Sequence, residues 1–260
     1  MAVPKIVTNV AYSKYESKLE KEVLKGPMPR HVGVIMDGNR RYAKEVLKTD
    51  NVSIGHKLGK KKVEEVANWC VNTKIKVLTI YAFSTENFNR DKKEVDFLLS
   101  LIRAMLDEVA KDENTHKHKI RVKVIGDRSM LPDDLMEAVR NVEEVTKDYD
   151  DYHFNIAVAY GGRQEIVTAI KKIAERVKDG TLNVEDIDES MISSELYTSD
   201  DPDPDLILRT SGELRISNFL IWQLAYSELY FTDVYWPGFR YIDFLRAIRS
   251  YQQRSRRYGV

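Results

Sequence analysis

The amino-acid sequence predicts the α/β fold class, with one domain built on a central, mainly parallel six-stranded sheet flanked by helices. Short apolar runs of strand length alternate with amphipathic segments of helix length along most of the 260 residues. No internal repeat or linker-like stretch divides the chain. Three of the expected strands end in clusters of polar side chains, and ligands of parallel sheets bind beyond such carboxyl ends. These observations predict a ligand site at one edge of the sheet.

Residues 1–28 are expected to form a helical arm, and residues 29–260 the main domain. Apolar and aromatic side chains of the arm recur at helical spacing, at Tyr12, Tyr15, Leu19 and Val23. Gly26, Pro27 and Pro29 end this helix. Such an arm can pack on the domain, cover an active site or cover a membrane.

Strands are expected where apolar residues follow one another without helical spacing. The first such run, 32–36, is short and is followed by three turn-forming residues in a row. The most apolar run lies at 77–83. The remaining strands are expected at 120–125, 154–160, 206–208 and 229–235.

Helices are expected between these strands, where apolar residues recur every three or four positions. They are placed at 60–70, 95–109, 132–145, 163–179, 190–196, 218–226 and 243–258. The polar stretches 48–53 and 111–119 are expected to be loops, and His116 and His118 are interpreted as solvated residues rather than metal ligands. The long apolar stripe at 95–109 has two interpretations: core packing, or the wall of a long apolar pocket.

Composition and charge limit the classes of function. Lysine plus arginine and aspartate plus glutamate number 41 each, so no global field favours nucleic acid or an anionic membrane. The one cysteine, Cys70, excludes an internal disulfide framework. No apolar run approaches twenty residues, and no signal-peptide core begins the sequence. We therefore expect a soluble, cytoplasmic protein without nucleic-acid partners, either free or peripheral to a membrane.

The stretch 31–42 carries the most informative chemistry. Its strand ends in a turn that opens a helix, with the sequence Asp37-Gly38-Asn39-Arg40-Arg41. Free N–H groups at a helix start and two guanidinium groups suit a phosphate. The carboxylate of Asp37 would repel that phosphate unless a divalent cation lies between them. Two interpretations follow: a metal-bridged diphosphate site, or an ordinary turn capped by Asp37 or Asn39.

Two further strand ends extend this cluster. The ends at 37–41, 84–90 and 209–217 bring together a carboxylate and five guanidinium groups, those of Asp37, Arg40, Arg41, Arg90, Arg209 and Arg215. Several arginines beside a metal-capable carboxylate favour a polyanion such as a diphosphate. The sequence has no Walker A motif, Rossmann glycine motif, zinc-binding cysteine pair or Gly-x-Ser-x-Gly motif, which disfavours the enzyme classes that need them.

Five motifs carry a resemblance to a known family. They are His31-Val-Gly-Val-Ile-Met-Asp-Gly-Asn-Arg-Arg-Tyr42, Gly55-His-Lys, Tyr81-Ala-Phe-Ser-Thr-Glu-Asn-Phe-Asn-Arg90, Tyr160-Gly-Gly-Arg and Arg209-Thr-Ser-Gly-Glu-Leu-Arg-Ile-Ser-Asn-Phe-Leu-Ile-Trp-Gln. In this order, the motifs resemble the cis-prenyltransferases, the undecaprenyl and dehydrodolichyl diphosphate synthases, and their archaeal members in particular. The resemblance covers about residues 29–259.

The resemblance implies Mg²⁺-dependent addition of isopentenyl diphosphate to an allylic diphosphate with Z geometry. The implied product is a long polyprenyl diphosphate, the precursor of a glycosyl carrier lipid, which is delivered to a membrane. The resemblance further implies a homodimer whose sheet and helices enclose an apolar tunnel. It therefore favours the pocket-wall interpretation of 95–109.

The same resemblance assigns roles to residues of this chain. Asp37 and Asn87 would be catalytic, Asp37 by holding Mg²⁺ and Asn87 by assisting proton removal. Glu228 would complete the metal site from across the dimer. Ser84 and residues within 209–217 would hold isopentenyl diphosphate. The full set of substrate-binding residues implied is Gly38, Asn39, Arg40, Arg41, Tyr42, His56, Ser84, Thr85, Glu86, Phe88, Arg90, Arg209, Arg215, Ile216, Ser217, Arg257 and Gly259.

Three departures from the family pattern bear on substrate and product. Leu214 stands where some members have a metal-site histidine, and Val52 stands where an arginine often contacts the allylic diphosphate. The tract 111–119 is longer than in bacterial medium-chain enzymes, and such an extension goes with longer products in the family. Val122 is the expected closed end of the tunnel.

Three other classes of protein would need residues that this sequence lacks, or would lack residues that it has. Non-catalytic partner subunits of the family lack the aspartate of the first motif and the later Asn-x-x-Arg, and this sequence has both, at Asp37 and 87–90. A phosphatase with Asp37 as nucleophile would need a second aspartate two residues on. Trans-prenyltransferases carry aspartate-rich motifs that are absent from the sequence.

Overall fold

A computed structural model describes residues 5–254, with side chains from residue 14 onward. Six strands of this part form one sheet in the order β3-β4-β2-β1-β5-β6, and every neighbouring pair is parallel. The strands are β1 (His31–Ile35), β2 (Val77–Ser84), β3 (Ile120–Ile125), β4 (Tyr152–Tyr160), β5 (Leu206–Arg209) and β6 (Glu228–Phe231). The predicted α/β class and six-stranded sheet are confirmed.

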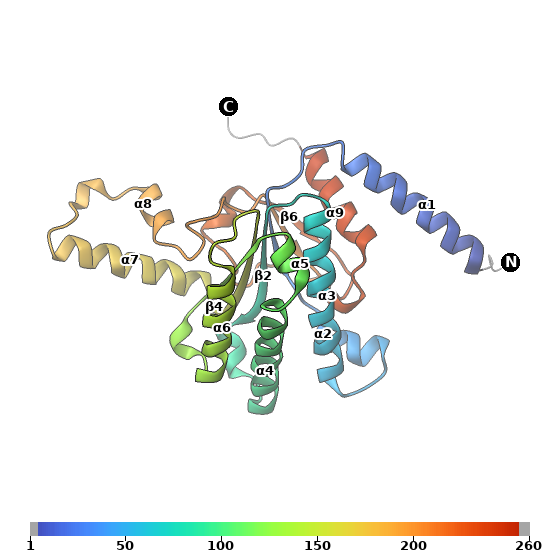
Figure 1. Cartoon of the computed structure of the whole chain (residues 1–260), viewed down its shortest axis with the longest axis horizontal. Helices are drawn as coiled ribbons and strands as arrows, with labels where there is room; N and C mark the ends of the chain where they lie inside the picture. Colours follow the sequence, from blue (N-terminus) through green and yellow to red (C-terminus); the bar gives the residue numbers. More distant parts are fainter. Residues whose placement is uncertain (1–4, 255–260) are drawn as a thin grey trace.

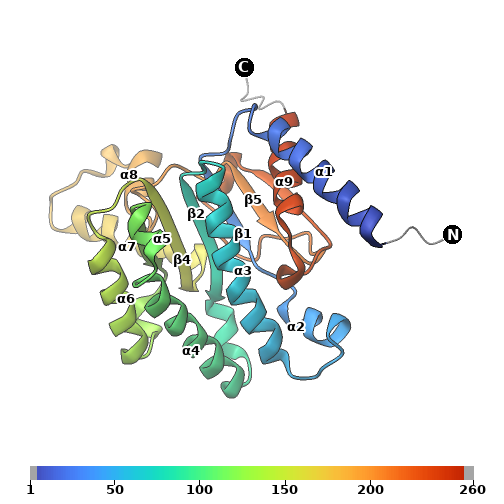
Figure 2. The same cartoon turned by 45° about the vertical axis from the view of Figure 1, so that its right-hand side comes forward.

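Helices cover the sheet and extend from it on two sides. They are α1 (Lys5–Val23), α2 (Asn39–Arg41), α3 (Val52–Asn72), α4 (Lys92–Val109), α5 (Glu113–Lys117), α6 (Asp133–Thr146), α7 (Gly162–Lys178), α8 (Glu189–Ser194) and α9 (Tyr241–Gln253). In Figures 1 and 2, α3, α4 and α6 lie in front of the strands, α1 lies along α9, and α7 and α8 project away from the opposite side. The Tyr241 hydroxyl donates to Glu20, and the Gln252 side-chain amide donates to the Val23 carbonyl, which joins α1 to α9.

The main hydrophobic core lies between one face of the sheet and α3, α4, α6 and α9. The central strands β1 and β5 are buried along their whole length. A smaller cluster, which includes Ile35, Tyr160 and Phe219, forms a separate apolar contact. Burial along the whole of a strand is typical of parallel sheets with both faces covered, and it explains why these strands read as continuous apolar runs.

Helix α3 begins earlier than predicted, at Val52 rather than after Gly59. The side chain of Asn51 caps it by accepting a hydrogen bond from the Ser53 backbone N–H, so the polar stretch is a helix start rather than a loop. Two glycines within α3 allow close contact with α2. A Cβ at Gly55 would lie 2.1 Å from the Asn39 carbonyl oxygen, and a Cβ at Gly59 would lie 2.2 Å from Asn39 Oδ1.

The helix predicted at 218–226 is wrong for its first half. Ser217, Asn218 and Leu220 have φ values of 48°, 64° and 44°, which an α-helix cannot accommodate, and only a 3₁₀ turn follows at Gln223–Tyr226. The irregular backbone is held at the start of α7, where Asn218 accepts hydrogen bonds from the backbone N–H groups of Gly162 and Arg163.

Three smaller predictions also differ from the structure. The last strand ends at Phe231 instead of 235. The tract 111–119 contains α5, which Asp112 caps through the Thr115 N–H, and His116 is hydrogen-bonded to Tyr149 and the Ala110 carbonyl. The final helix begins at Tyr241, and residues 255–258 of its predicted span lie outside the described residues. None of the described helices is both long and apolar enough to cross a membrane.

Candidate active site

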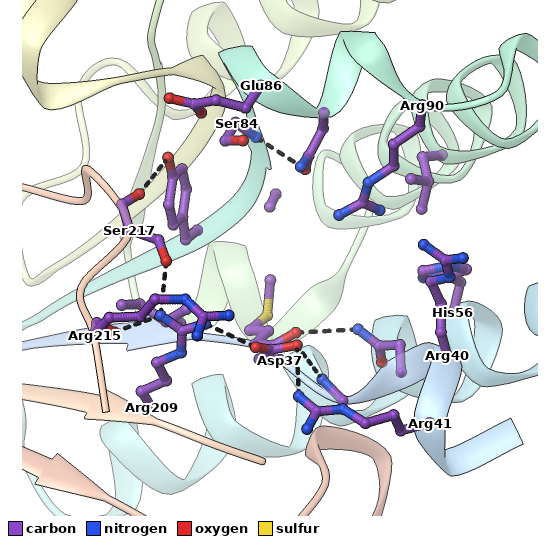
Figure 3. A pocket seen from close by; sticks show the side chains of 18 of the residues that line it. Asp37, Arg40, Arg41, His56, Ser84, Glu86, Arg90, Arg209, Arg215 and Ser217 are labelled. Atoms are coloured by element: carbon purple, nitrogen blue, oxygen red, sulfur yellow. Dashed lines mark hydrogen bonds and ion pairs between the residues drawn. The ribbon is translucent and has the colours of Figure 1, made fainter. Parts of the chain in front are cut away.

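The carboxyl ends of β1, β2 and β5 enclose a pocket of about 810 Å³, here called the charged pocket. The three predicted strand ends meet in it. Figure 3 shows Arg209 and Arg215 on one side of Asp37, Arg40 and Arg41 on the other, and Ser84, Glu86 and Arg90 across the pocket. The predicted site residues that line the pocket are Asp37, Gly38, Asn39, Arg40, Arg41, His56, Ser84, Glu86, Asn87, Arg90, Arg209, Arg215 and Ser217.

Other predicted site residues do not line this pocket. Tyr42, Thr85, Phe88 and Ile216 are chain neighbours of pocket residues. The ring of Phe88 packs edge-on against the ring of Phe83, with 4.9 Å between the ring centroids, so the Phe88 side chain points to the core. Arg257 and Gly259 lie outside the described residues. The two departures from the family pattern also lie elsewhere: Val52 starts α3, and Leu214 is 78% exposed.

Glu228 lies apart from Asp37 within the chain. It is the first residue of β6 and pairs with Leu206 at the amino end of β5, whereas the charged pocket lies at the carboxyl ends. Its carboxylate forms an ion pair with Arg254 at 2.6 Å. A metal site shared by Asp37 and Glu228 therefore stays a prediction that requires a second subunit.

Asp37 is held as a carboxylate at the bottom of the charged pocket. Its Oδ1 accepts a hydrogen bond from the Gly38 N–H at 2.7 Å, and its Oδ2 accepts one from Arg209 Nη2 at 2.8 Å. Arg41 lies 3.6 Å from Oδ1. Burial opposes ionisation of Asp37, but the hydrogen bonds and charges of these neighbours outweigh it and hold the pKa below its ordinary value. Gly38 has a φ of 101°, so the turn that orients this carboxylate suits glycine.

Arg209 connects two of the strand ends. Its side chain is only 4% exposed, and Nη1 donates to Ser217 Oγ at 2.8 Å and to the Arg215 carbonyl while Nη2 donates to Asp37. Its Nε is buried without a hydrogen-bond partner among the described residues. The guanidinium thus fixes the position of Asp37 relative to the loop at 215–217, and it retains a free donor that suits an anion.

Two glutamates in this region were missed by sequence reasoning. Glu94 lies 3.1 Å from Arg90, 3.7 Å from His56 and 3.9 Å from Arg40. Glu213 lies 3.2 Å from Arg41 and also pairs with Arg215. The four-residue spacing of Arg90 and Glu94 at a helix start was the available signal for the first pair. A bound diphosphate would replace or join these carboxylates as the partner of the arginines.

His56 is neutral at physiological pH. Burial lowers its pKa to about 4, although the nearby Glu94 acts in the opposite direction. Its Nε2 is buried and has no hydrogen-bond partner among the described residues. His56 lines the charged pocket, and this nitrogen lies 3.7 Å from the Glu94 carboxylate, beyond hydrogen-bond distance.

Ser84 and Asn87 form a cap at the end of β2. The side-chain oxygen of Asn87 accepts a hydrogen bond from the Ser84 N–H at 3.2 Å, within the 3₁₀ turn Thr85–Asn89. Tyr81, another pocket residue that sequence reasoning missed, donates through its hydroxyl to the Ser217 carbonyl at 3.2 Å. The first bond is local to the β2 end, and the Tyr81 bond joins β2 to the 215–217 loop.

Two further cavities continue from the charged pocket along the groove between α3 and α4. The small cavity, of about 70 Å³, shares Met36, Ala82 and Leu98 with the charged pocket. The large cavity, of about 680 Å³, lies toward the amino ends of β2, β3 and β4 and shares Val63 and Met105 with the small one. Val122 lines neither cavity, whereas Ile120 lines the large one. The apolar stripe of α4 thus contributes to both the core and a cavity wall.

The donor set of the charged pocket fits a hard divalent cation only in combination with a substrate. Among residues 14–254, no group of three or more His, Cys, Asp or Glu side chains is placed to hold a metal ion. Mg²⁺, however, is usually bound through one or two carboxylates together with substrate phosphates and water. The ionised Asp37 beside several arginines fits that mode.

Comparisons with known proteins agree with this geometry. The family model Prenyltransf, described as "Putative undecaprenyl diphosphate synthase", matches residues 35–259. A tritrans,polycis-undecaprenyl-diphosphate synthase (geranylgeranyl-diphosphate specific) of Thermoplasma volcanium is 57% identical over 96% of this chain and 96% of its own. The enzyme of the same name from Pyrococcus abyssi is 50% identical over 99% of this chain and 97% of its own.

Two solved structures share the fold. The lavandulyl diphosphate synthase of Lavandula x intermedia, in complex with dimethylallyl diphosphate, superposes with a TM-score of 0.86 at 41% identity. The comparison covers 92% of this chain and 100% of that chain. A probable undecaprenyl diphosphate synthase of Campylobacter jejuni superposes with a TM-score of 0.73 at 34% identity, over 90% of this chain and 100% of its own.

Fold, pocket and sequence identity together define a prenyltransferase. The chain belongs to the undecaprenyl diphosphate synthase family and is a cis-prenyltransferase.

Proposed function

We propose that this enzyme condenses isopentenyl diphosphate onto an allylic diphosphate, with geranylgeranyl diphosphate as the preferred primer, to make a long Z-polyprenyl diphosphate. The observation that carries this proposal is the continuity of the charged pocket with apolar cavities between α3 and α4. An allylic diphosphate has the same two-part chemistry. The primer preference rests on the names of the archaeal relatives.

Each substrate has a set of charged groups suited to it. In our proposal, the turn at 38–41 and His56 bind the allylic diphosphate, and Ser84, Arg209, Arg215 and Ser217 bind isopentenyl diphosphate. Asp37 and the diphosphate oxygens would hold Mg²⁺, which supplies charge neutralisation for the leaving diphosphate when bound. The neutral His56 can donate a hydrogen bond from its free Nε2 to the same anion.

The reaction breaks the allylic C–O bond, forms a C–C bond to the double bond of isopentenyl diphosphate and removes one proton from that substrate. Positive charge develops on the allylic carbon, and the apolar wall of Met36, Ala82 and Leu98 excludes water that would capture it. The amide of Asn87 is a poor base. Its bond to the Ser84 N–H suits an orienting role, in which a diphosphate oxygen takes the proton.

We further propose that the enzyme acts as a homodimer. Exposed apolar side chains on and near α7 support a protein contact there, among them Val167, Ile170 and Tyr226. Dimerisation would also give Glu228 a route to the metal site of the other subunit.

The proposal is tested by product analysis. Purified enzyme is incubated with Mg²⁺, isopentenyl diphosphate and, in turn, dimethylallyl, geranyl, farnesyl or geranylgeranyl diphosphate, and products are identified by mass and by double-bond geometry. We expect a ladder of products that differ by one isoprene unit and carry new Z double bonds, formed fastest from geranylgeranyl diphosphate. Hydrolysis without chain growth, or transfer of the prenyl group to another acceptor only, would contradict it.

We also propose that α1 attaches the enzyme to an anionic membrane, where its lipid product is needed. Four exposed lysines form a stripe along α1 and the turn that follows it, at Lys14, Lys18, Lys21 and Lys25. None of them forms an ion pair with a carboxylate among the described residues. A local stripe of this kind attracts anionic headgroups even in a protein of zero net charge, at about 1 kcal/mol per lysine.

Vesicle binding tests this attachment. Replacing all four lysines by serine should weaken binding to vesicles rich in phosphatidylglycerol at least about tenfold. Binding to phosphatidylcholine vesicles should be weak throughout, and added salt should reduce the difference. A control variant removes four exposed lysines elsewhere, at Lys61, Lys92, Lys147 and Lys171. Equal losses in the two variants would show that net charge, not the stripe, governs binding.

A further inference from the structure

The junction between the small and the large cavity is formed by one side chain from each helix. Val63 on α3 and Met105 on α4 are the two residues that line both cavities. Each is only 4% exposed. The space on the side of the charged pocket is about 70 Å³, and the space beyond is about 680 Å³. The groove between α3 and α4 is therefore narrow on the near side of this pair and wide beyond it.

We propose that Val63 and Met105 form a neck that selects allylic primers by length. This inference rests on the proposed function, because it assumes that the primer's prenyl chain runs from the charged pocket into the groove. The tail of a two-isoprene primer ends on the near side of the neck. A four-isoprene primer passes it and places its tail in the large cavity.

The position of the neck along α3 supports this assignment. His56 lines the charged pocket and lies seven residues before Val63, about 10 Å along the helix at 1.5 Å per residue. Only a chain that extends past this distance leaves the narrow space for the wide one, where contact with apolar lining residues such as Leu78 and Phe154 stabilises its tail. Met105 suits a neck, since its unbranched side chain adapts to a passing chain more readily than a branched one.

Cys70 offers a direct reporter of passage through the neck. It is the only cysteine of the chain and lines the large cavity, a further seven residues, about 10 Å, along α3 from Val63. A tail that reaches the large cavity should shield this thiol from a small reagent. A tail that stops at the neck should leave it accessible.

The test measures shielding and affinity in the full-length enzyme. The probes are the S-thiolodiphosphate analogues of geranyl and geranylgeranyl diphosphate, which bind without reacting, and methyl methanethiolsulfonate labels Cys70 at pH 9. Burial raises the pKa of the Cys70 thiol to about 12, so labelling is slow and its rate is compared with and without each analogue. We expect the geranylgeranyl analogue to slow labelling at least tenfold and the geranyl analogue less than twofold. Equal protection by both would overturn the proposal.

Variants of the neck separate this inference from the proposed function. Met105→Phe should weaken binding of the geranylgeranyl analogue at least tenfold and change binding of the geranyl analogue by no more than about threefold. Met105→Ala should reduce the difference in affinity between the two analogues. Val184→Phe, at an exposed side chain that lines none of the three cavities, serves as control. Inorganic pyrophosphate binding should be unchanged in all three, and thermal melts identify a variant that does not fold. If Met105→Phe bound neither analogue but still bound pyrophosphate normally, the proposed neck would be refuted. Failure of every analogue to bind the wild type would instead refute the proposed function.

Discussion

Asp37 and Arg209 form one hydrogen-bonded unit at the bottom of the charged pocket, so their contributions to activity are coupled. Arg209 donates to both Asp37 and Ser217 and is nearly inaccessible to solvent. Arg215 differs, because its guanidinium lies near the surface and pairs with Glu213. The two arginines of one motif thus have different surroundings: Arg209 holds the carboxylate in place, and Arg215 is the more exposed of the two, which in our proposal leaves its charge to the diphosphate.

Lysine substitutions distinguish these roles. Lysine keeps the charge but loses the planar fork that bonds two partners at once. Arg215→Lys should raise the KM for isopentenyl diphosphate about tenfold and leave kcat within about threefold. Arg209→Lys should also lower kcat at least tenfold, because Asp37 loses its partner. Initial rates with each substrate varied in turn measure this. An Arg209→Lys effect confined to the KM of the allylic substrate would show that the two diphosphate sites are assigned the wrong way round.

Among individual site residues, the sequence predicts the arginines better than the glutamates that pair with them. Arginines clustered at three strand ends can be recognised from the chain alone, since parallel strands share one carboxyl edge. Glu94 and Glu213 could not be placed in the same way, because a glutamate in a helix start or a polar loop is usually solvated. Only the packing of α2, α3 and α4 brings Glu94 near Arg40 and His56.

At the scale of elements, a buried polar network fixes the amino ends of three strands. His31 in β1 is hydrogen-bonded to Thr79 of β2 at 2.8 Å, and Asn155 of β4 donates to Thr79 at 3.2 Å and to Asp201 at 2.6 Å. His153 of β4 bonds to Asp201. The acidic turn before β5 therefore acts as a clamp across the sheet, at the edge opposite to the active site.

This network predicts a pH dependence of stability. The hydrogen bond to Asp201, with help from Asp150, raises the pKa of His153. A raised folded-state pKa means that the stabilisation is fully present below about pH 6.5, the unfolded value, and is lost as pH rises through the folded value. Thermal melts from pH 5 to 9 should therefore show the melting temperature of the wild type falling on the alkaline side.

A non-titrating substitution checks the source of this fall. His153→Gln should flatten the alkaline fall and cost about 1.5–3 kcal/mol at pH 5, the usual contribution of a hydrogen bond to a charged group. His118→Gln in the loop before β3 is the control and should retain the wild-type slope. An unchanged slope in His153→Gln would assign the pH dependence to other groups.

The elements that could be predicted are those whose apolar pattern is strong. All six strands were expected within a few residues of their observed bounds, because buried parallel strands are continuous apolar runs. The start of α3 was missed, since Asn51 and Ser53 favour loops and caps equally. The segment after Ser217 was predicted as a helix from its apolar residues, and its left-handed backbone depends on contacts with α7 that the local sequence does not reveal.

At the scale of the whole molecule, the order of the strands determines where the ligand site lies. The chain passes from β1 to β2 on one side and later adds β5 on the other, so the crevice at the carboxyl end of β1 is the switch point where ligands of such sheets bind. The long helices α3 and α4 start near this crevice and run away from it, which puts their apolar groove directly behind the charged pocket. A substrate with a charged head and a long apolar tail fits this layout.

The most direct measurement of the central claim is product formation by Asp37→Ala and by the wild type with and without Mg²⁺. With geranylgeranyl and isopentenyl diphosphates, the wild type should form its product ladder in Mg²⁺, lose it in EDTA and regain it when Mg²⁺ is restored. Asp37→Ala should lower turnover at least about a thousandfold, about 4 kcal/mol of barrier, while the surface control Asp96→Ala remains near the wild type. A full ladder in EDTA, or a loss below tenfold in Asp37→Ala, would contradict the account.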